Sequence, residues 1–144
     1  MLEAVSTRSK RNRTFILLGV CAALGLAAAA IGIDDNLAGI LFAYLAAIAL
    51  VASLVHPWQT FRRYRRLLYL SILAIVVAVL LHNLLDFFAS NVGGVGSDLL
   101  GGAAAAFFIV GTLLAPAGVL VGGIGALVMF LRERDEHHGA SAPQ

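Results

Sequence analysis

The stretch that decides the fold is LLYLSILAIVVAVLLHNLLDFF, residues 67–88, which follows directly after a cluster of arginines. Its first fifteen residues contain nothing more polar than one tyrosine and one serine. A helix rises ~1.5 Å per residue and the hydrocarbon layer is ~30 Å thick, so this segment is long enough to cross a membrane. Its last part carries His82, Asn83 and Asp86. Because a polar group at that depth is costly unless it is paired, these residues are the first candidates for a functional site.

The composition places the whole chain in the membrane class. Of its 144 residues, 60% are hydrophobic and 12% are charged, with a mean hydropathy of +0.93, whereas soluble domains are about a quarter charged. Three further apolar segments occupy residues 15–33, 37–55 and 99–131. We therefore predict an all-α integral membrane four-helix bundle with short connections and spans at about residues 15–33, 37–55, 67–88 and 103–131.

The first and last apolar segments each allow a second interpretation. Residues 15–33 follow a basic stretch and contain a run of alanines, as secretory signal peptides do, but the apolar stretch exceeds the usual signal core and favours a retained helix. Residues 99–131 are longer than one span requires. Either Pro116 bends this segment, with Thr112 bonding a freed carbonyl, or residues 99–106 form a separate outer helix capped by Ser97.

The basic residues indicate how the spans are oriented. The chain carries a formal net charge of +2, and all ten Lys and Arg lie within residues 8–13, 62–66 and 132–134. The other two connections hold only acidic charges, at Asp34, Asp35 and Asp98. The positive-inside rule then predicts a multi-pass plasma-membrane protein with both termini cytoplasmic.

This orientation divides the chain into three parts. Residues 1–14 form a basic cytoplasmic arm, disordered or lying on the membrane surface. Residues 15–131 form the transmembrane domain, and residues 132–144 form a charged, disordered cytoplasmic tail. Because the cations flank apolar segments, we expect anionic lipid headgroups rather than nucleic acid as their partners.

The connection at residues 56–66 alternates aromatic and basic side chains. This pattern predicts a short interfacial helix between the second and third spans, with its arginines toward anionic headgroups. An alternative is that these arginines only set the topology. The candidate headgroup contacts are Arg62, Arg63, Arg65, Arg66 and Trp58.

A face of small residues runs along the fourth span. In lipid, helices associate where small residues let their backbones approach, so this face should meet another helix, either within the monomer or in a homo-oligomer. The first and second spans offer small-residue faces to receive it, around Ala22 and Ala43. The residues of the fourth span are Gly111, Ala115, Gly118, Gly122 and Gly125. In the third span Ser71, Ile75, Ala78, His82 and Asp86 share the side that should face the bundle.

The His82 and Asp86 pair has the i, i+4 spacing of two metal ligands on one helix face. A metal site needs at least one more ligand, from Asn83 or the acidic connections, and this makes the pair a weak metal candidate. The alternatives are a structural hydrogen bond between His82 and Asp86, or a role in proton transfer or substrate contact. The chain has no serine-histidine-acid set, no HExxH and no CxxC. A haem held by two histidines would need a second histidine at the depth of His82, and the sequence places none there. We therefore predict no catalytic residue and no cofactor.

These observations predict a small integral membrane protein without catalysis of its own. We expect it to act as a subunit or scaffold of a membrane complex, or as a homo-oligomer. The alternative is a transporter or channel for a small solute, in which His82, Asn83 and Asp86 form a polar site near the outer face.

Cysteine labelling of intact cells tests the predicted topology. We expect Asp35→Cys and Ser97→Cys to react only from outside, and Thr60→Cys and Ser141→Cys only from inside, because the basic connections stay in the cytoplasm. Labelling of the two termini from opposite sides would mean that a span is miscounted through cleavage of the first segment.

Overall fold

A computed structural model describes residues 2–33, 36–56, 58 and 60–139, and the burial of side chains within residues 11–33, 36–56, 58 and 60–134. This part of the chain is helical apart from its short connections. The elements are α1 (Leu2–Ile31), α2 (Leu37–Val55), α3 (Phe61–Asn91), α4 (Val95–Ile109), the π-helical turn η1 (Val110–Leu114) and α5 (Ala115–Gly139). Because α4, η1 and α5 are continuous, four helices are long and apolar enough to cross a membrane.

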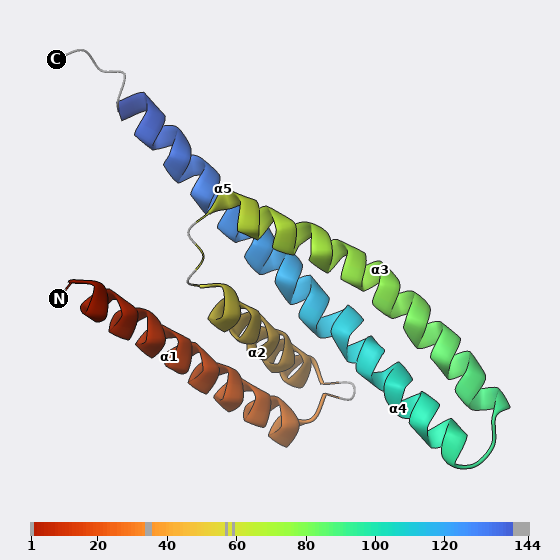
Figure 1. Cartoon of the computed structure of the whole chain (residues 1–144). Coiled ribbons are helices and arrows are strands. Elements are labelled where there is room, and N and C mark those ends of the chain that lie inside the picture. Colours follow the sequence, from red (N-terminus) through yellow and green to blue (C-terminus); the bar gives the residue numbers. More distant parts are fainter. Residues whose placement is uncertain (1, 34–35, 57, 59, 140–144) are drawn as a thin grey trace.

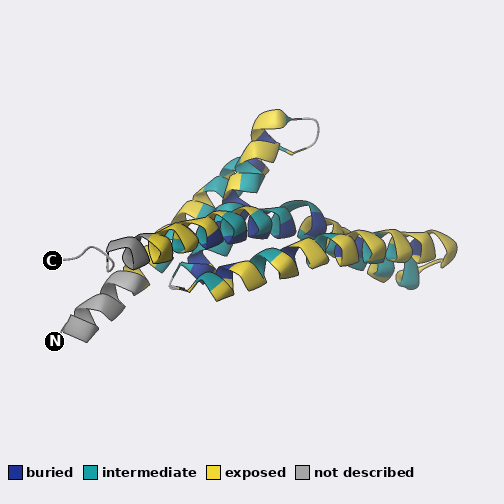
Figure 2. Cartoon of the chain, turned by 90° about the horizontal axis from the view of Figure 1, so that it is seen from above, coloured by how far each residue is buried: buried dark blue, intermediate teal, exposed yellow. Residues whose placement is uncertain are grey.

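The helices form two antiparallel hairpins, one of α1 and α2 and the other of α3 with the continuous α4, η1 and α5 (Figure 1). Within the described residues α1 packs against α2 alone, while α2 also contacts α5 and η1. The hairpins meet beside the connection between α2 and α3 and diverge toward their turns (Figures 1 and 2). The four-helix bundle that the sequence predicts is therefore not confirmed, since α1 and α4 make no contact there.

The turn between α1 and α2 is held by Asn36 and two glycines. Asn36 caps α2, because its side-chain oxygen accepts from the amide of Ala38 at 3.1 Å and its side-chain nitrogen donates to the carbonyl of Ile31 at 3.3 Å. Gly32 has a φ of 85°, and its carbonyl fills the space where Gly39 would carry a Cβ. Both positions therefore require glycine.

The small-residue face of the last helix packs against α3. A Cβ on Gly122 would lie 2.9 Å from the backbone nitrogen of Leu68, and one on Gly111 would lie 3.1 Å from the Cβ of Ala78. Gly118 meets Ser71 and Gly125 meets the ring of Tyr64, while Ala115 is also buried. The face is thus occupied within the monomer, and its partner is the third span rather than the first or second.

The chain passes Pro116 through a π-helical turn. Proline has no amide hydrogen, and the preceding turn widens so that the amide of Ala115 donates to the carbonyl of Val110. The hydroxyl of Thr112 donates to the carbonyl of Phe108 at 2.6 Å, rather than to a carbonyl freed by the proline. The widened turn lets α4 continue into α5, so residues 99–106 are not a separate outer helix.

Three other segments differ from the expected boundaries. The helix α1 begins at Leu2 and α5 extends to Gly139, so the basic arm and the start of the tail are helical. The expected interfacial helix is instead the beginning of α3, which runs without a break from Phe61. At the start of α4 the cap is Gly94, with a φ of 69°, and the hydroxyl of Ser97 donates to the carbonyl of Ala89 at 2.9 Å. Asp34, Asp35 and Pro57 lie outside the described residues.

Adding a methyl group at Gly122 tests the contact between α3 and α5. The Cβ would meet the α3 backbone at Leu68, so we expect Gly122→Ala to lower the free energy of unfolding by about 1–2 kcal/mol, measured by denaturant titration in mixed micelles. The matched control is Gly123→Ala, where a Cβ has nothing within 4 Å. Its helix propensity should make it neutral or up to about 1 kcal/mol more stable. Equal stabilities of the two variants would contradict the close approach.

Candidate functional site

His82 lies between α3 and α4. Its Nδ1 donates a hydrogen bond of 2.9 Å to the carbonyl oxygen of Ala104, and its ring centre is 5.2 Å from that of Phe108. A carbonyl oxygen can only accept, so the ring hydrogen sits on Nδ1 in the neutral side chain. The close approach is possible because Ala104, which is 2% exposed, has too small a side chain to keep the imidazole away. His82 therefore links the two helices.

Asp86 does not pair with His82 in the described part of the chain. Its side chain is exposed, and the imidazole has taken a carbonyl of the facing helix as its acceptor. Asn83 is also exposed, and its side-chain nitrogen donates to the carbonyl of Val79 at 2.8 Å. The three residues of the expected polar site therefore do not converge. The i, i+4 spacing predicted a common side for His82 and Asp86, but the hydrogen-bond partner of His82 belongs to another helix.

The described residues contain no group of three or more His, Cys, Asp or Glu side chains that could hold a metal ion. Asp98 is in the first turn of α4, and Asp34 and Asp35 lie outside the described residues. His82 and Asp86 alone offer too few ligands for a zinc site.

Three polar side chains share an exposed face at the end of α3. Asn83, Asp86 and Ser90 lie at i, i+3 and i+7, with Phe87 between them at i+4, and all four are exposed. The hydroxyl of Ser90 donates to the carbonyl of Phe87 at 2.8 Å. We call Asn83, Asp86 and Ser90 the polar face of α3. Its amide oxygen and carboxylate accept no hydrogen bond from the described residues.

Tyr64 joins the two hairpins at the opposite end of α3. The side chain is 8% exposed, and its hydroxyl lies 3.3 Å from the carbonyl oxygens of Val55 and Trp58. The ring packs edge-on against Trp58, with 5.9 Å between ring centres. In an interfacial helix over residues 56–66, such as the sequence predicts, the aromatic ring of Tyr64 would face the membrane. It faces the protein instead. The sequence contained an indication of this, because Tyr64 lies seven residues before Ser71 and fourteen before Ala78, on the same side of the helix.

The arginines around this junction lie on the surface. All four expected headgroup contacts of α3 are exposed, and the guanidinium of Arg65 stacks on the ring of Phe61 at 5.6 Å. Trp58 is half-buried between the hairpins. The exposed residues are Arg62, Arg63, Arg65 and Arg66.

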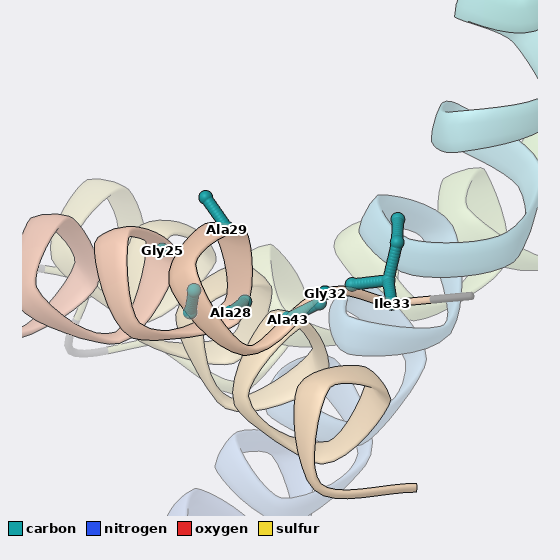
Figure 3. Close-up of a pocket in the computed structure, with 7 residues that line it drawn as sticks. Gly25, Ala28, Ala29, Gly32, Ile33 and Ala43 are labelled. Atoms are coloured by element: carbon teal, nitrogen blue, oxygen red, sulfur yellow. The ribbon is translucent and has the colours of Figure 1, made fainter. Parts of the chain in front are cut away.

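A groove of about 510 Å³ lies between α1 and α2 (Figure 3). Its side chains are small or apolar, so it suits an acyl chain or an apolar side chain and offers no side-chain chemistry. It includes Ala43, around which the sequence indicated a small-residue face of the second span, and none of the residues of the polar face of α3. The lining residues are Gly25, Ala28, Ala29, Gly32, Ile33, Ala43 and Ala46.

No protein-family model, curated protein or solved structure matches the chain. Function is therefore inferred from the side chains and their contacts.

A double-mutant cycle tests the separation of His82 from Asp86. We expect His82→Phe to lower the free energy of unfolding by about 1 kcal/mol, the loss of one hydrogen bond to Ala104. Asp86→Asn should leave it nearly unchanged, and the effects of the two changes should add within about 0.5 kcal/mol. A coupling energy well above that value, measured in the same micelles, would show that the two side chains interact.

Proposed function

We propose that the protein is a small, non-catalytic integral membrane protein that serves as a subunit or scaffold of a membrane assembly, with other subunits or with copies of itself. The observation that carries the proposal is the polar face of α3, whose Asn83 and Asp86 are exposed within the apolar segment 67–88. In this proposal the end that carries the α3 arginines faces the cytoplasm of the plasma membrane, as do both termini.

The depth of the polar face supports a protein partner. Measured along the helix from Arg66, Asn83 lies ~26 Å and Asp86 ~30 Å away, in a hydrocarbon layer of ~30 Å. The side-chain oxygen of Asn83 would then face lipid tails, which offer no donor. A polar side chain from a second membrane helix would satisfy it, and such interhelical hydrogen bonds stabilise association by about 0.6–2 kcal/mol each.

The arrangement of α1 also supports assembly. Within the described residues α1 contacts α2 alone, so most of its apolar surface is open to lipid or to a neighbouring helix. The small residues of the groove between α1 and α2 would let another apolar group approach closely.

The contacts of His82 favour a structural role over catalysis or transport. Its partners in the described structure are a backbone carbonyl and a phenylalanine ring, and neither is a nucleophile or a carboxylate. Because His82 lies between two helices while Asn83 and Asp86 are on the exposed surface, the three residues do not line one path.

Native mass spectrometry from mild detergent tests the assembly. We expect the parent protein to appear as a defined oligomer or with co-purifying subunits, and Asn83→Leu with Asp86→Leu to weaken the association about tenfold, since two interhelical hydrogen-bond acceptors are lost. The matched control is Tyr69→Leu, which removes an exposed polar group from the other end of α3. A parent that is a monodisperse monomer without partners, or a double variant that assembles as the parent does, would contradict the proposal.

A further inference from the structure

Three arginines lie together on one exposed face at the start of α3. Arg65 and Arg66 follow Arg62 at i+3 and i+4, so the Cβ atom of each is about 5–6 Å from that of Arg62. All three side chains are exposed, whereas Arg63 is turned by about 160° from Arg65 and points elsewhere. We infer that these three arginines, the arginine triad, bind the phosphate group of an anionic phospholipid. The inference does not depend on the proposed assembly, because the polar face lies at the other end of α3.

The buried side of α3 fixes the direction of the triad. Tyr64 is 8% exposed and packs against α5. Two residues of an α-helix are about 200° of rotation, so Arg62 and Arg66 lie on the side opposite Tyr64 and point away from the other helices. The guanidinium of Arg65 stacks on the ring of Phe61 at 5.6 Å. One of the three cationic groups is therefore already ordered without a ligand.

The chain around the triad offers few carboxylates to balance its charge. Residues 36–91 contain one, Asp86, which lies twenty residues after Arg66 and thus ~30 Å along the helix. On α5 the first carboxylate is Glu133, which stands between two arginines. Like charges at i and i+4 repel each other, and the helix dipole disfavours cations in the first turns. A bound anion would offset both effects.

The exposed surface next to the triad is apolar. Tyr69, Leu70 and Leu73 follow Arg66 at i+3, i+4 and i+7, and they are 63%, 63% and 57% exposed. They therefore continue the face of the triad into the apolar segment. A phospholipid whose phosphate contacts the triad would lay an acyl chain along these side chains. Free phosphate or an acidic protein segment would leave them uncovered, so this surface favours a phospholipid.

Two other helices bring cations to the same end of the molecule. Arg13 of α1 and Tyr64 line one groove, and the ring centre of Phe130 in α5 is 6.1 Å from that of Phe61. Because α5 continues beyond the start of α3 (Figure 1), Arg132 lies farther out than the triad. Cations of three helices thus gather where the apolar surfaces end, which is the level of anionic headgroups in a membrane.

Lipid titration by native mass spectrometry of the full-length protein in non-ionic detergent tests the triad. Purified protein separates lipid binding from any effect of the arginines on membrane insertion. The probes are phosphatidylglycerol and phosphatidylcholine with identical acyl chains, and we expect the parent to retain the first about tenfold better. Arg62→Gln and Arg66→Gln should each weaken retention of phosphatidylglycerol roughly five- to tenfold, because each removes a charge-assisted contact. Arg66→Lys keeps the charge but loses the planar fork, so it should weaken retention about threefold.

The matched control is Arg11→Gln, which removes one positive charge from an exposed site on α1 and should change retention by no more than about twofold. Equal losses in Arg11→Gln and Arg66→Gln would show diffuse surface charge and overturn the triad, as would unchanged retention in Arg66→Lys or equal retention of phosphatidylcholine. Displacement by millimolar inorganic phosphate, but not by chloride at equal ionic strength, would overturn the lipid assignment in favour of free phosphate. An acidic protein that is lost from Arg66→Gln while lipid retention stays unchanged would assign the triad to a protein partner instead.

Discussion

The close approach of the α3 and α5 backbones is the contact on which the other features depend. Tyr64, Ser71 and Ala78 recur every seven residues and meet Gly125, Gly118 and Gly111, which recur at the same interval. A seven-residue period keeps one seam in contact along two slightly supercoiled helices. Because lipid provides no hydrophobic drive between helices, this contact is stabilised by close packing at small residues. The ring of Tyr64 packs in the same seam, and its hydroxyl reaches the carbonyls of Val55 in α2 and Trp58 in the connection.

The π-helical turn extends this seam beyond Pro116. A kink at the proline would turn α4 away from α3, but the widened turn keeps Ala104 in line with Gly111 and Gly118, again at intervals of seven residues. The carbonyl of Ala104 therefore stays within reach of His82. A backbone adjustment near the middle of the last helix thus determines the hydrogen bonding of the most polar turn of α3.

The sequence predicted the helical class, the four segments long enough to span a membrane, and the small residues that share a face. It did not predict which helix this face meets, because small residues occur on the first, second and third spans alike and only the shapes of the folded helices distinguish them. The hydrogen-bond acceptor of His82 could not be predicted for a related reason. Asp86 can be recognised in the sequence because it lies four residues after His82. The actual acceptor is a backbone oxygen of another helix, which no pattern of side chains reveals.

The two ends of the molecule therefore have different physical characters. At the basic end, Tyr64 ties the hairpins together with two carbonyl contacts and an aromatic cluster, surrounded by exposed cations. At the opposite end the hairpins diverge (Figure 2), and the polar face of α3 has acceptors without donors in the described structure. A fixed end with exposed cations and an open end with unused acceptors therefore present different surfaces. Tyr64 and Asn83 are nineteen residues apart on α3, which is about five helical turns, so substitutions at one end should leave the contacts at the other unchanged.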